Sequence, residues 1–387
     1  MQHKLNQLII TLALTLTVIA GVSVTASAVE VAGKPRVAKL PLQEWTAVAA
    51  QKGWLQEEFA KYNAKVEIVN VSAMNIAGVE ASLLDRGDLH FALRMQYPSL
   101  QHKLNGLDAV VVWQSGDAPV RRNTIVVLND APYHKLEDLK GTKFGSWRIS
   151  CPYFGAYEVF KKGGVPLDTD FAKGDIRFVN ITGQAQTSSF LAGQLASITG
   201  HPGSASYAAL YTQGLIKELS ASVPGGVYLR GGGRTSWFVP RVWARENPDL
   251  VKAFLIAYQR TRLWVKDNPD AAATIVARET RIPKHIANYI IKDDSSYAFV
   301  AGQPSQPDAV SAIKLFQQWA YDNGDDFIKR KRLTDAQIEQ FIDKRFFEGG
   351  EYFVYTGDDP NYQPKSAAVT VSGPPVAAAH WSNSNNH

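Results

Sequence analysis

Residues 138–162 read DLKGTKFGSWRISCPYFGAYEVFKK and contain the unit that predicts the fold. The run 143–147 is predicted as a strand, and 153–162 as a helix that follows it after a short loop. A strand joined at once to a helix is typical of α/β proteins, in which helices connect parallel strands. This stretch therefore indicates an α/β fold if the same alternation recurs along the chain.

The alternation recurs on both sides of this unit. Toward the N-terminus, strands are predicted at 36–40, 66–71, 89–93 and 109–113, with helices beginning near Trp45 and at 76–85 and 100–104. Toward the C-terminus, strands are predicted at 124–128, 176–179, 195–198, 227–229 and 236–239, with a helix at 187–192. The chain is therefore predicted to form largely parallel sheets covered by helices.

The last third is predicted to be helical. Asn247-Pro248-Asp249 and Asn268-Pro269-Asp270 each combine an N-cap type residue, a proline at the first helical position and an early acid. Thr334 and Gln337 have the spacing of a capping box. After Tyr355 the chain is rich in Pro, Ser, Asn, Gly and Ala, and this tail is predicted to be disordered.

The first 28 residues have the pattern of a secretory signal peptide. Lys4 precedes an uncharged, mostly apolar run at 8–24, and Ala26-Ser27-Ala28 fits a cleavage site. A membrane anchor is the alternative, because this run is borderline in length for a spanning helix, which needs about 20 apolar residues. The cleavage pattern favours export through the inner membrane, removal of the signal near Ala28 and a periplasmic mature protein.

The remaining chain is predicted to form two lobes. Residues 29–121 form the first part of lobe 1, 122–231 form lobe 2, 232–355 return to lobe 1 with the C-terminal helices, and 356–387 are the tail. The crossings lie near Arg121-Arg122-Asn123 and Gly231-Gly232-Gly233, and the glycines are the candidate hinge.

Composition narrows the function. The formal charge is +5, or +4 once the segment with Lys4 is removed, which suits an anionic small ligand and no nucleic acid. The basic run 329–332 is interpreted as a solvated turn, with docking to a membrane partner as the alternative. Cys151 is the single cysteine, so an intrachain disulfide is excluded. A monomer is expected.

Catalytic motifs are missing from the sequence. It contains no G-x-S-x-G, no G-x-x-x-x-G-K-[ST] and no H-E-x-x-H, and no two histidines of the mature chain have the spacing of metal ligands. Cys151 follows Arg148 and precedes a helix, which favours a thiolate, but no base is recognisable beside it. The expectation is a protein with no catalytic residue, metal or cofactor, and not an enzyme.

Five segments resemble one family. They are QKGWL with KVEI (51–55 and 65–68), LDRGDLHF (84–91), DLKGTK (138–143) and RENPDLVKAFL (245–255). The chain from Lys34 to about Arg278 is similar to the periplasmic binding proteins of ABC importers for nitrate, taurine and alkane sulfonates. Two segments depart from the family pattern: Gly193–Ser197 lacks the usual acid, and His201-Pro202 stands where the family has Trp-x-Pro. The ligand is therefore not carried over from the family.

The resemblance implies a type II periplasmic binding protein fold, with two α/β lobes and a ligand cleft between them, and a permease in the inner membrane as partner. Ligands of parallel sheets bind beyond the carboxyl ends of the strands. The candidate ligand-binding residues are those that follow predicted strands or stand near the return crossing: Gln43, Trp45, Asn75, Arg94, Gln96, Gln114, Trp147, Arg148, Tyr153, His201, Arg234, Ser236 and Trp237.

These residue types favour a small organic anion. Arg148 or Arg234 could hold a sulfonate or carboxylate with two N–H groups, helix N-termini could add backbone N–H groups, and the tryptophans could cover an apolar body. A sulfonate, alkane or aromatic, or taurine is therefore ranked above nitrate. Two alternatives stay open: a ligand-sensing domain for a membrane receptor, and an enzyme on the same fold related to the thiamine-pyrimidine synthases, whose cysteine-rich motif this chain lacks.

Overall fold

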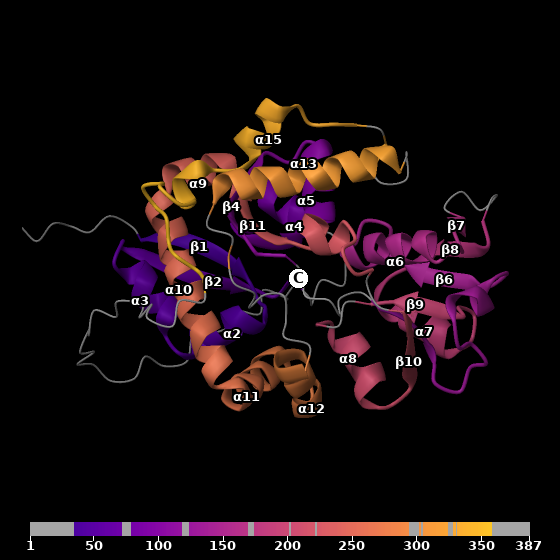
Figure 1. Cartoon of the computed structure of the whole chain (residues 1–387). Coiled ribbons are helices and arrows are strands. Elements are labelled where there is room, and N and C mark those ends of the chain that lie inside the picture. The colour runs from indigo at the N-terminus through magenta and orange to yellow at the C-terminus, as the bar shows by residue number, and fades with distance from the viewer. Residues whose placement is uncertain are drawn as a thin grey trace, which may run out of the picture. The chain divides into compact units, whose positions relative to one another are not determined.

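The structure is a computed structural model that describes residues 35–71, 79–117, 124–168, 174–200, 203–220, 223–293, 302, 305–323, 328–329 and 331–357. These residues belong almost entirely to a compact unit that begins at Val37 (Figure 1). The predicted signal peptide, the crossing at 121–123 and most of the predicted tail lie outside the described residues. None of the described helices is long and apolar enough to cross a membrane.

The N-terminal part alternates strands and helices as predicted. Its elements are β1 (Arg36–Pro41), α2 (Glu44–Gln51), α3 (Trp54–Ala60), β2 (Ala64–Val69), α4 (Val79–Asp85), β3 (Ala92–Met95), α5 (Gln96–Leu104) and β4 (Ala109–Gln114). Gly53 separates α2 from α3 with a left-handed φ of 76°, which a glycine adopts without strain. Strands β1 and β2 pair with each other in a two-stranded sheet.

A six-stranded sheet follows. Its elements are β5 (Ile125–Leu128), η3 (Leu136–Leu139), β6 (Lys143–Ser146), α6 (Cys151–Lys162), β7 (Leu167–Asp168), β8 (Ile176–Asn180), α7 (Gly183–Leu191), β9 (Ser197–Thr199), α8 (Ala205–Thr212) and β10 (Ile216–Ser220). The strand order is β10-β5-β9-β6-β8-β7. Strand β6 is parallel to both β8 and β9, so these three central strands end at the same edge of the sheet.

The chain then returns to the first part. Strand β11 (Thr235–Pro240) inserts between β3 and β4 and is antiparallel to both. The helical elements α9 (Arg241–Glu246), α10 (Pro248–Asp267), α11 (Pro269–Thr280), α12 (Lys284–Asn288), η5 (Tyr289–Asp293), α13 (Gln306–Asp322), α15 (Asp335–Phe341) and η7 (Lys344–Phe346) complete the described chain. The α/β fold class predicted from the sequence is confirmed, with two differences: the returning strand makes this small sheet antiparallel, and β5 and β10 add antiparallel pairs to the six-stranded sheet.

The return crossing corrects one prediction. The run 227–229, predicted as a strand, enters the π-helical turn η4 (Tyr228–Gly232) instead. Gly231 and Gly232 are buried there: an added Cβ would lie 3.2 Å from the Cβ of Ala312 and 2.5 Å from the ring of Phe154, respectively. These two glycines therefore allow close packing of the crossing against α13 and α6.

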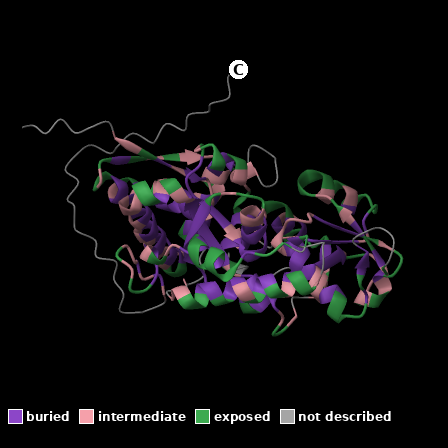
Figure 2. Cartoon of the chain, turned by 90° about the horizontal axis from the view of Figure 1, so that it is seen from above, coloured by how far each residue is buried: buried purple, intermediate pink, exposed green. Residues whose placement is uncertain are grey.

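Aromatic rings join the parts of the core. Tyr97 of α5, Phe154 of α6 and Phe316 of α13 pack together, with ring centroids 4.9 to 6.3 Å apart. Figure 1 shows α13 running beside α5. Buried residues line the strands and one face of each long helix, while exposed residues occupy the other face (Figure 2).

The three predicted helix starts are confirmed. The capping box of Thr334 and Gln337 is confirmed, since each side chain bonds the other's backbone N–H. The helix starts predicted at Asn247-Pro248-Asp249 and Asn268-Pro269-Asp270 are confirmed as well: each asparagine is the N-cap, the proline stands in the first turn and the aspartate follows it, although neither asparagine makes a side-chain capping bond. Each side-chain Nδ2 donates backward to a carbonyl, Trp243 O at 3.1 Å and Trp264 O at 3.0 Å, so these asparagines terminate the preceding helices.

Candidate functional site

A pocket of about 380 Å³ opens at the carboxyl ends of β6, β8 and β9. Its first wall comes from the six-stranded sheet and the helices that follow these strands, and its second wall comes from α2, β3 and α5. The lining of the first wall is Ser146, Trp147, Ile149, Ser150, Cys151, Pro152, Thr182, Gly183, Gln186, Thr187, Ile198, Thr199, Gly200, Gly203, Ser204, Ser206, Tyr207 and Leu210, and that of the second wall is Glu44, Leu93, Arg94, Met95 and Pro98.

Three helix N-termini meet at the first wall. The N-cap residues Ser150 of α6, Thr182 of α7 and Ser204 of α8 all line the pocket. Ser150 and Ser204 each accept a hydrogen bond from the backbone N–H three residues later, at 3.2 and 3.3 Å, whereas Thr182 makes no such side-chain bond. The first N–H groups of a helix carry no intrahelical partner and lie at the positive end of its dipole. Three such ends in one pocket favour an anion.

Hydrogen bonds hold the polar side chains of the first wall in place. The Nε2 of Gln186 donates to Gly145 O at 3.0 Å and to Thr199 O at 3.1 Å, so both of its protons are used and its oxygen is left for other donors. The hydroxyl of Tyr207 bonds Thr124 Oγ1 at 2.5 Å. Because these groups are fixed by the sheet, they need little reordering when a ligand binds.

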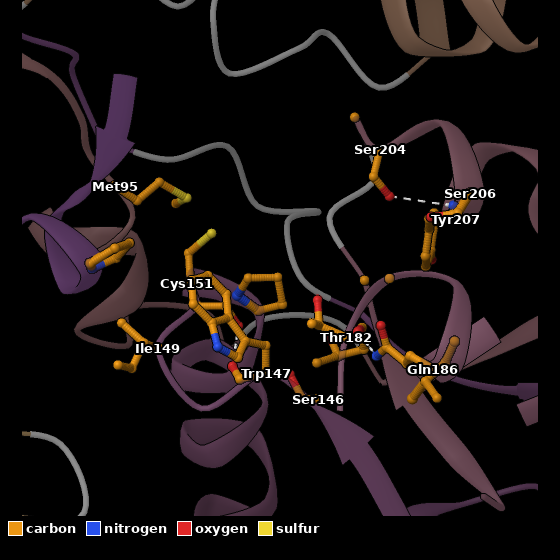
Figure 3. A pocket seen from close by; sticks show the side chains of 18 of the residues that line it. Met95, Ser146, Trp147, Ile149, Cys151, Thr182, Gln186, Ser204, Ser206 and Tyr207 are labelled. Atoms are coloured by element: carbon orange, nitrogen blue, oxygen red, sulfur yellow. Dashed lines mark hydrogen bonds between the residues drawn. The ribbon is translucent and has the colours of Figure 1, made fainter. Parts of the chain in front are cut away.

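Less polar side chains occupy one side of the pocket. Figure 3 shows Met95, Cys151 and Trp147 on that side, and Gln186, Ser204 and Tyr207 on the other. Trp147 is half-buried and follows β6 directly. The pocket thus combines a polar end with an apolar flank, as sites for small organic molecules usually do.

The charges of the pocket all belong to the second wall. Among the described lining residues only Glu44 and Arg94 are charged. Arg94 forms an ion pair with Glu80 of α4. The Glu44 carboxylate, in the first turn of α2, has no ion-pair or hydrogen-bond partner from another described residue, and burial raises its pKa although its own backbone N–H lowers it.

The structure places the residues predicted from the sequence in several different surroundings. Arg94 and Trp147 line the pocket. Gln114, Arg234 and Ser236 form a polar cluster at the edge of the small sheet, in which Arg234 bonds Asp117 at 2.7 Å and Gln114 at 3.3 Å. These three are not among the lining residues.

The other predicted residues have structural contacts. Trp45 and Trp237 are fully buried and pack edge to face at 5.4 Å, and Gln43 accepts a hydrogen bond from the Trp45 indole at 3.2 Å. Gln96 is buried at the start of α5, and Tyr153 is buried 4.7 Å from the ring of Phe178.

Arg148 lies between two lining residues, Trp147 and Ile149, without lining the pocket itself. Its guanidinium stands over Phe178 at 5.5 Å and its backbone N–H donates to Asn180 at 2.9 Å. Asn75 and His201 lie outside the described residues. Among those that are described, no group of three or more His, Cys, Asp or Glu side chains could hold a metal ion.

The sequence prediction missed the residues that build the first wall. Thr182, Gln186, Ser204 and Tyr207 were not among the candidates. A serine or threonine directly before a helix is a recognisable signal, and it was available at Ser150 and Thr182. Ser204 precedes a helix, α8, that the sequence pattern did not predict.

Comparison with known proteins identifies the family and the fold. Residues 46–272, more than half of the chain, match the family described as NMT1/THI5 like. The alkanesulfonate-binding protein SsuA from Xanthomonas axonopodis pv. citri, solved bound to MOPS, has a TM-score of 0.64 at 18% identity over 79% of this chain and 98% of its own. The periplasmic aliphatic sulphonate binding protein SsuA from Escherichia coli gives 0.62 at 18% identity over 78% and 91%.

An enzyme shares the fold as well. The C27S mutant of the desulfurization enzyme DszB, in complex with biphenyl-2-sulfinic acid, has a TM-score of 0.55 at 14% identity over 82% of this chain and 96% of its own. No curated protein sequence matches the chain. The resemblance noted in the sequence is confirmed: the chain has the fold of the periplasmic sulfonate-binding proteins and belongs to the NMT1/THI5-like family.

Proposed function

We propose that this chain is the periplasmic solute-binding protein of an ABC importer, which captures a small organic anion, a sulfonate, and delivers it to a permease in the inner membrane. The observation that carries the proposal is the convergence of the α6, α7 and α8 N-termini on one pocket. A sulfonate has three oxygens that accept hydrogen bonds, so it can use N–H groups from several helices at once. In this proposal the pocket is the cleft between two lobes, one built on the six-stranded sheet and the other on the two smaller sheets.

The size and flank of the pocket support an organic ligand. Its volume of about 380 Å³ exceeds what nitrate fills, and Trp147 with Met95 offers surface for an apolar body. The ligands in the solved relatives point the same way, since MOPS is a sulfonate and biphenyl-2-sulfinic acid is an aromatic sulfur acid. Taurine, alkane sulfonates and aromatic sulfonates are the members of this class that we propose to test.

We propose binding without turnover. Cys151 is the one thiol in the pocket, and among the described lining residues no histidine or lysine stands with it as a base. The fold shared with DszB makes desulfurization of a sulfinate the competing function. Incubation with biphenyl-2-sulfinate separates the two: a binding protein releases no sulfite over time, whereas steady sulfite release that Cys151→Ser abolishes would establish an enzyme.

The experiment for binding uses the mature chain from Val29, unfolded and refolded to remove any ligand carried through purification. Thermal melts and calorimetric titrations with MOPS, hexanesulfonate, taurine, benzenesulfonate, benzoate and nitrate compare the ligand classes. A ligand at about 100 times its Kd adds about 2.7 kcal/mol of stability. We expect at least one sulfonate to do so while nitrate does not; no response to any sulfonate would refute the proposal.

A further inference from the structure

The two walls of the pocket differ in charge in a way that constrains the ligand. The first wall presents helix N-termini and, among its described lining residues, no charged side chain. The second wall presents Arg94, which Glu80 neutralises, and Glu44, which no described residue neutralises. The side-chain charge left unbalanced on the described lining is therefore negative.

A purely anionic ligand would form favourable interactions with the first wall alone. Its acid group would bind the N-termini of α6, α7 and α8, but it would displace water from Glu44 and supply no hydrogen-bond donor in return. A buried carboxylate without a partner is costly, and a second negative charge in the same pocket increases this cost. A ligand that also carries a cationic donor satisfies both walls.

We propose that the ligand is a zwitterionic organic acid, whose acid group lies against the N-termini of α6, α7 and α8 and whose protonated amine pairs with Glu44. The inference rests on the proposed function and narrows the ligand class of the same pocket. Glu44 is then the residue that determines specificity, because it distinguishes an amine from a methylene group at that end of the ligand. Burial raises the pKa of Glu44 in the ligand-free protein. A bound ammonium group offsets this effect, because an opposite charge nearby favours the carboxylate.

The test uses matched ligands and matched variants. Cyclohexylaminopropanesulfonate and cyclohexylbutanesulfonate differ in one amine that replaces a methylene, and taurine and propanesulfonate form a smaller pair. Calorimetric titrations at pH 7 measure the Kd of all four for the wild type, Glu44→Gln and the control Glu246→Gln. Glu246 is an exposed carboxylate of α9 that does not line the pocket. Thermal melts without ligand verify that each variant is folded.

We expect the wild type and Glu246→Gln to bind the amine member of a pair about 10-fold more tightly, as a desolvated charge pair should provide. In Glu44→Gln this preference should disappear, through weaker binding of the amine and not of its analogue. Equal affinities within each pair for the wild type would overturn the inference and leave the proposed function standing. This outcome is measured on the wild type alone, so it does not depend on whether a variant folds. Failure of all four sulfonates to bind would refute both.

Discussion

The two walls of the pocket face the ligand site with different parts of the protein. The first wall, after β6, β8 and β9, offers backbone N–H groups and neutral side chains such as Thr182 and Gln186. The second wall, from α2 and β3, offers the side-chain charges of Glu44 and Arg94. Backbone dipoles are fixed by the sheet and do not titrate, whereas side-chain charges depend on burial, partners and pH. The first wall therefore suits recognition of a permanent anion, and the second suits discrimination among ligands.

The largest effect is expected from the two tryptophans associated with these walls. Trp45, behind the second wall, is fully buried between Trp237, Phe254 and Tyr258, so Trp45→Ala should lower the free energy of unfolding by about 3–5 kcal/mol. Trp147, half-buried on the first wall, should lose ligand affinity when changed to Ala, with a far smaller loss of stability. Denaturant unfolding and ligand titration of both variants measure the contrast. A larger loss of stability in Trp147→Ala than in Trp45→Ala would contradict the prediction.

A charge placed on the first wall should produce the next largest effect. Thr182→Asp can still cap α7, because Asp is a good N-cap, but it puts a carboxylate where the anion is proposed to bind. We expect sulfonate affinity to fall about 100-fold, or about 2.7 kcal/mol, without loss of thermal stability. The control Thr182→Asn has the same shape and capping ability without the charge, and should lose clearly less. Equal losses in the two variants would remove electrostatics from the explanation.

Acid should lower the free energy of unfolding through a histidine beside the second wall. His102 lies near the Arg94–Glu80 pair, and burial, followed by the charge of Arg94, lowers its pKa from 6.5 to about 4, against a smaller raising effect of Glu80. A histidine with a depressed folded-state pKa contributes stability above its unfolded pKa that is lost as the pH falls from 6.5 toward 4. With its partial exposure, the loss should be on the order of 2 kcal/mol.

Unfolding measured from pH 7 to pH 4 tests this expectation. His102→Gln should flatten the stability profile over that range, and the exposed His134→Gln should not. A profile that keeps its slope in His102→Gln would assign the acid loss to other groups. His90 is the first alternative, because burial, with a contribution from Lys39, also lowers its pKa to about 4.

The local pattern of the sequence was enough for the elements and their chemistry. The strand and helix around Lys143–Ser146 and Cys151–Lys162, the capping box at Thr334 and the presence of Arg94 and Trp147 at strand ends all follow from periodicity and residue type. These features depend on neighbours within a few residues, which the chain itself specifies. The α/β class follows because strand and helix alternate many times.

Tertiary structure decided which strand ends meet. Ser150, Thr182 and Ser204 belong to three separate strand–helix units, and they share a pocket because β8, β6 and β9 are adjacent and parallel in the sheet. Strand order results from pairing between distant segments, which local periodicity does not encode. The sequence also did not determine which of two neighbouring side chains is buried. Trp45 and Glu44 are consecutive residues, yet the packing of α2 directs the ring into the core and leaves the carboxylate to line the pocket.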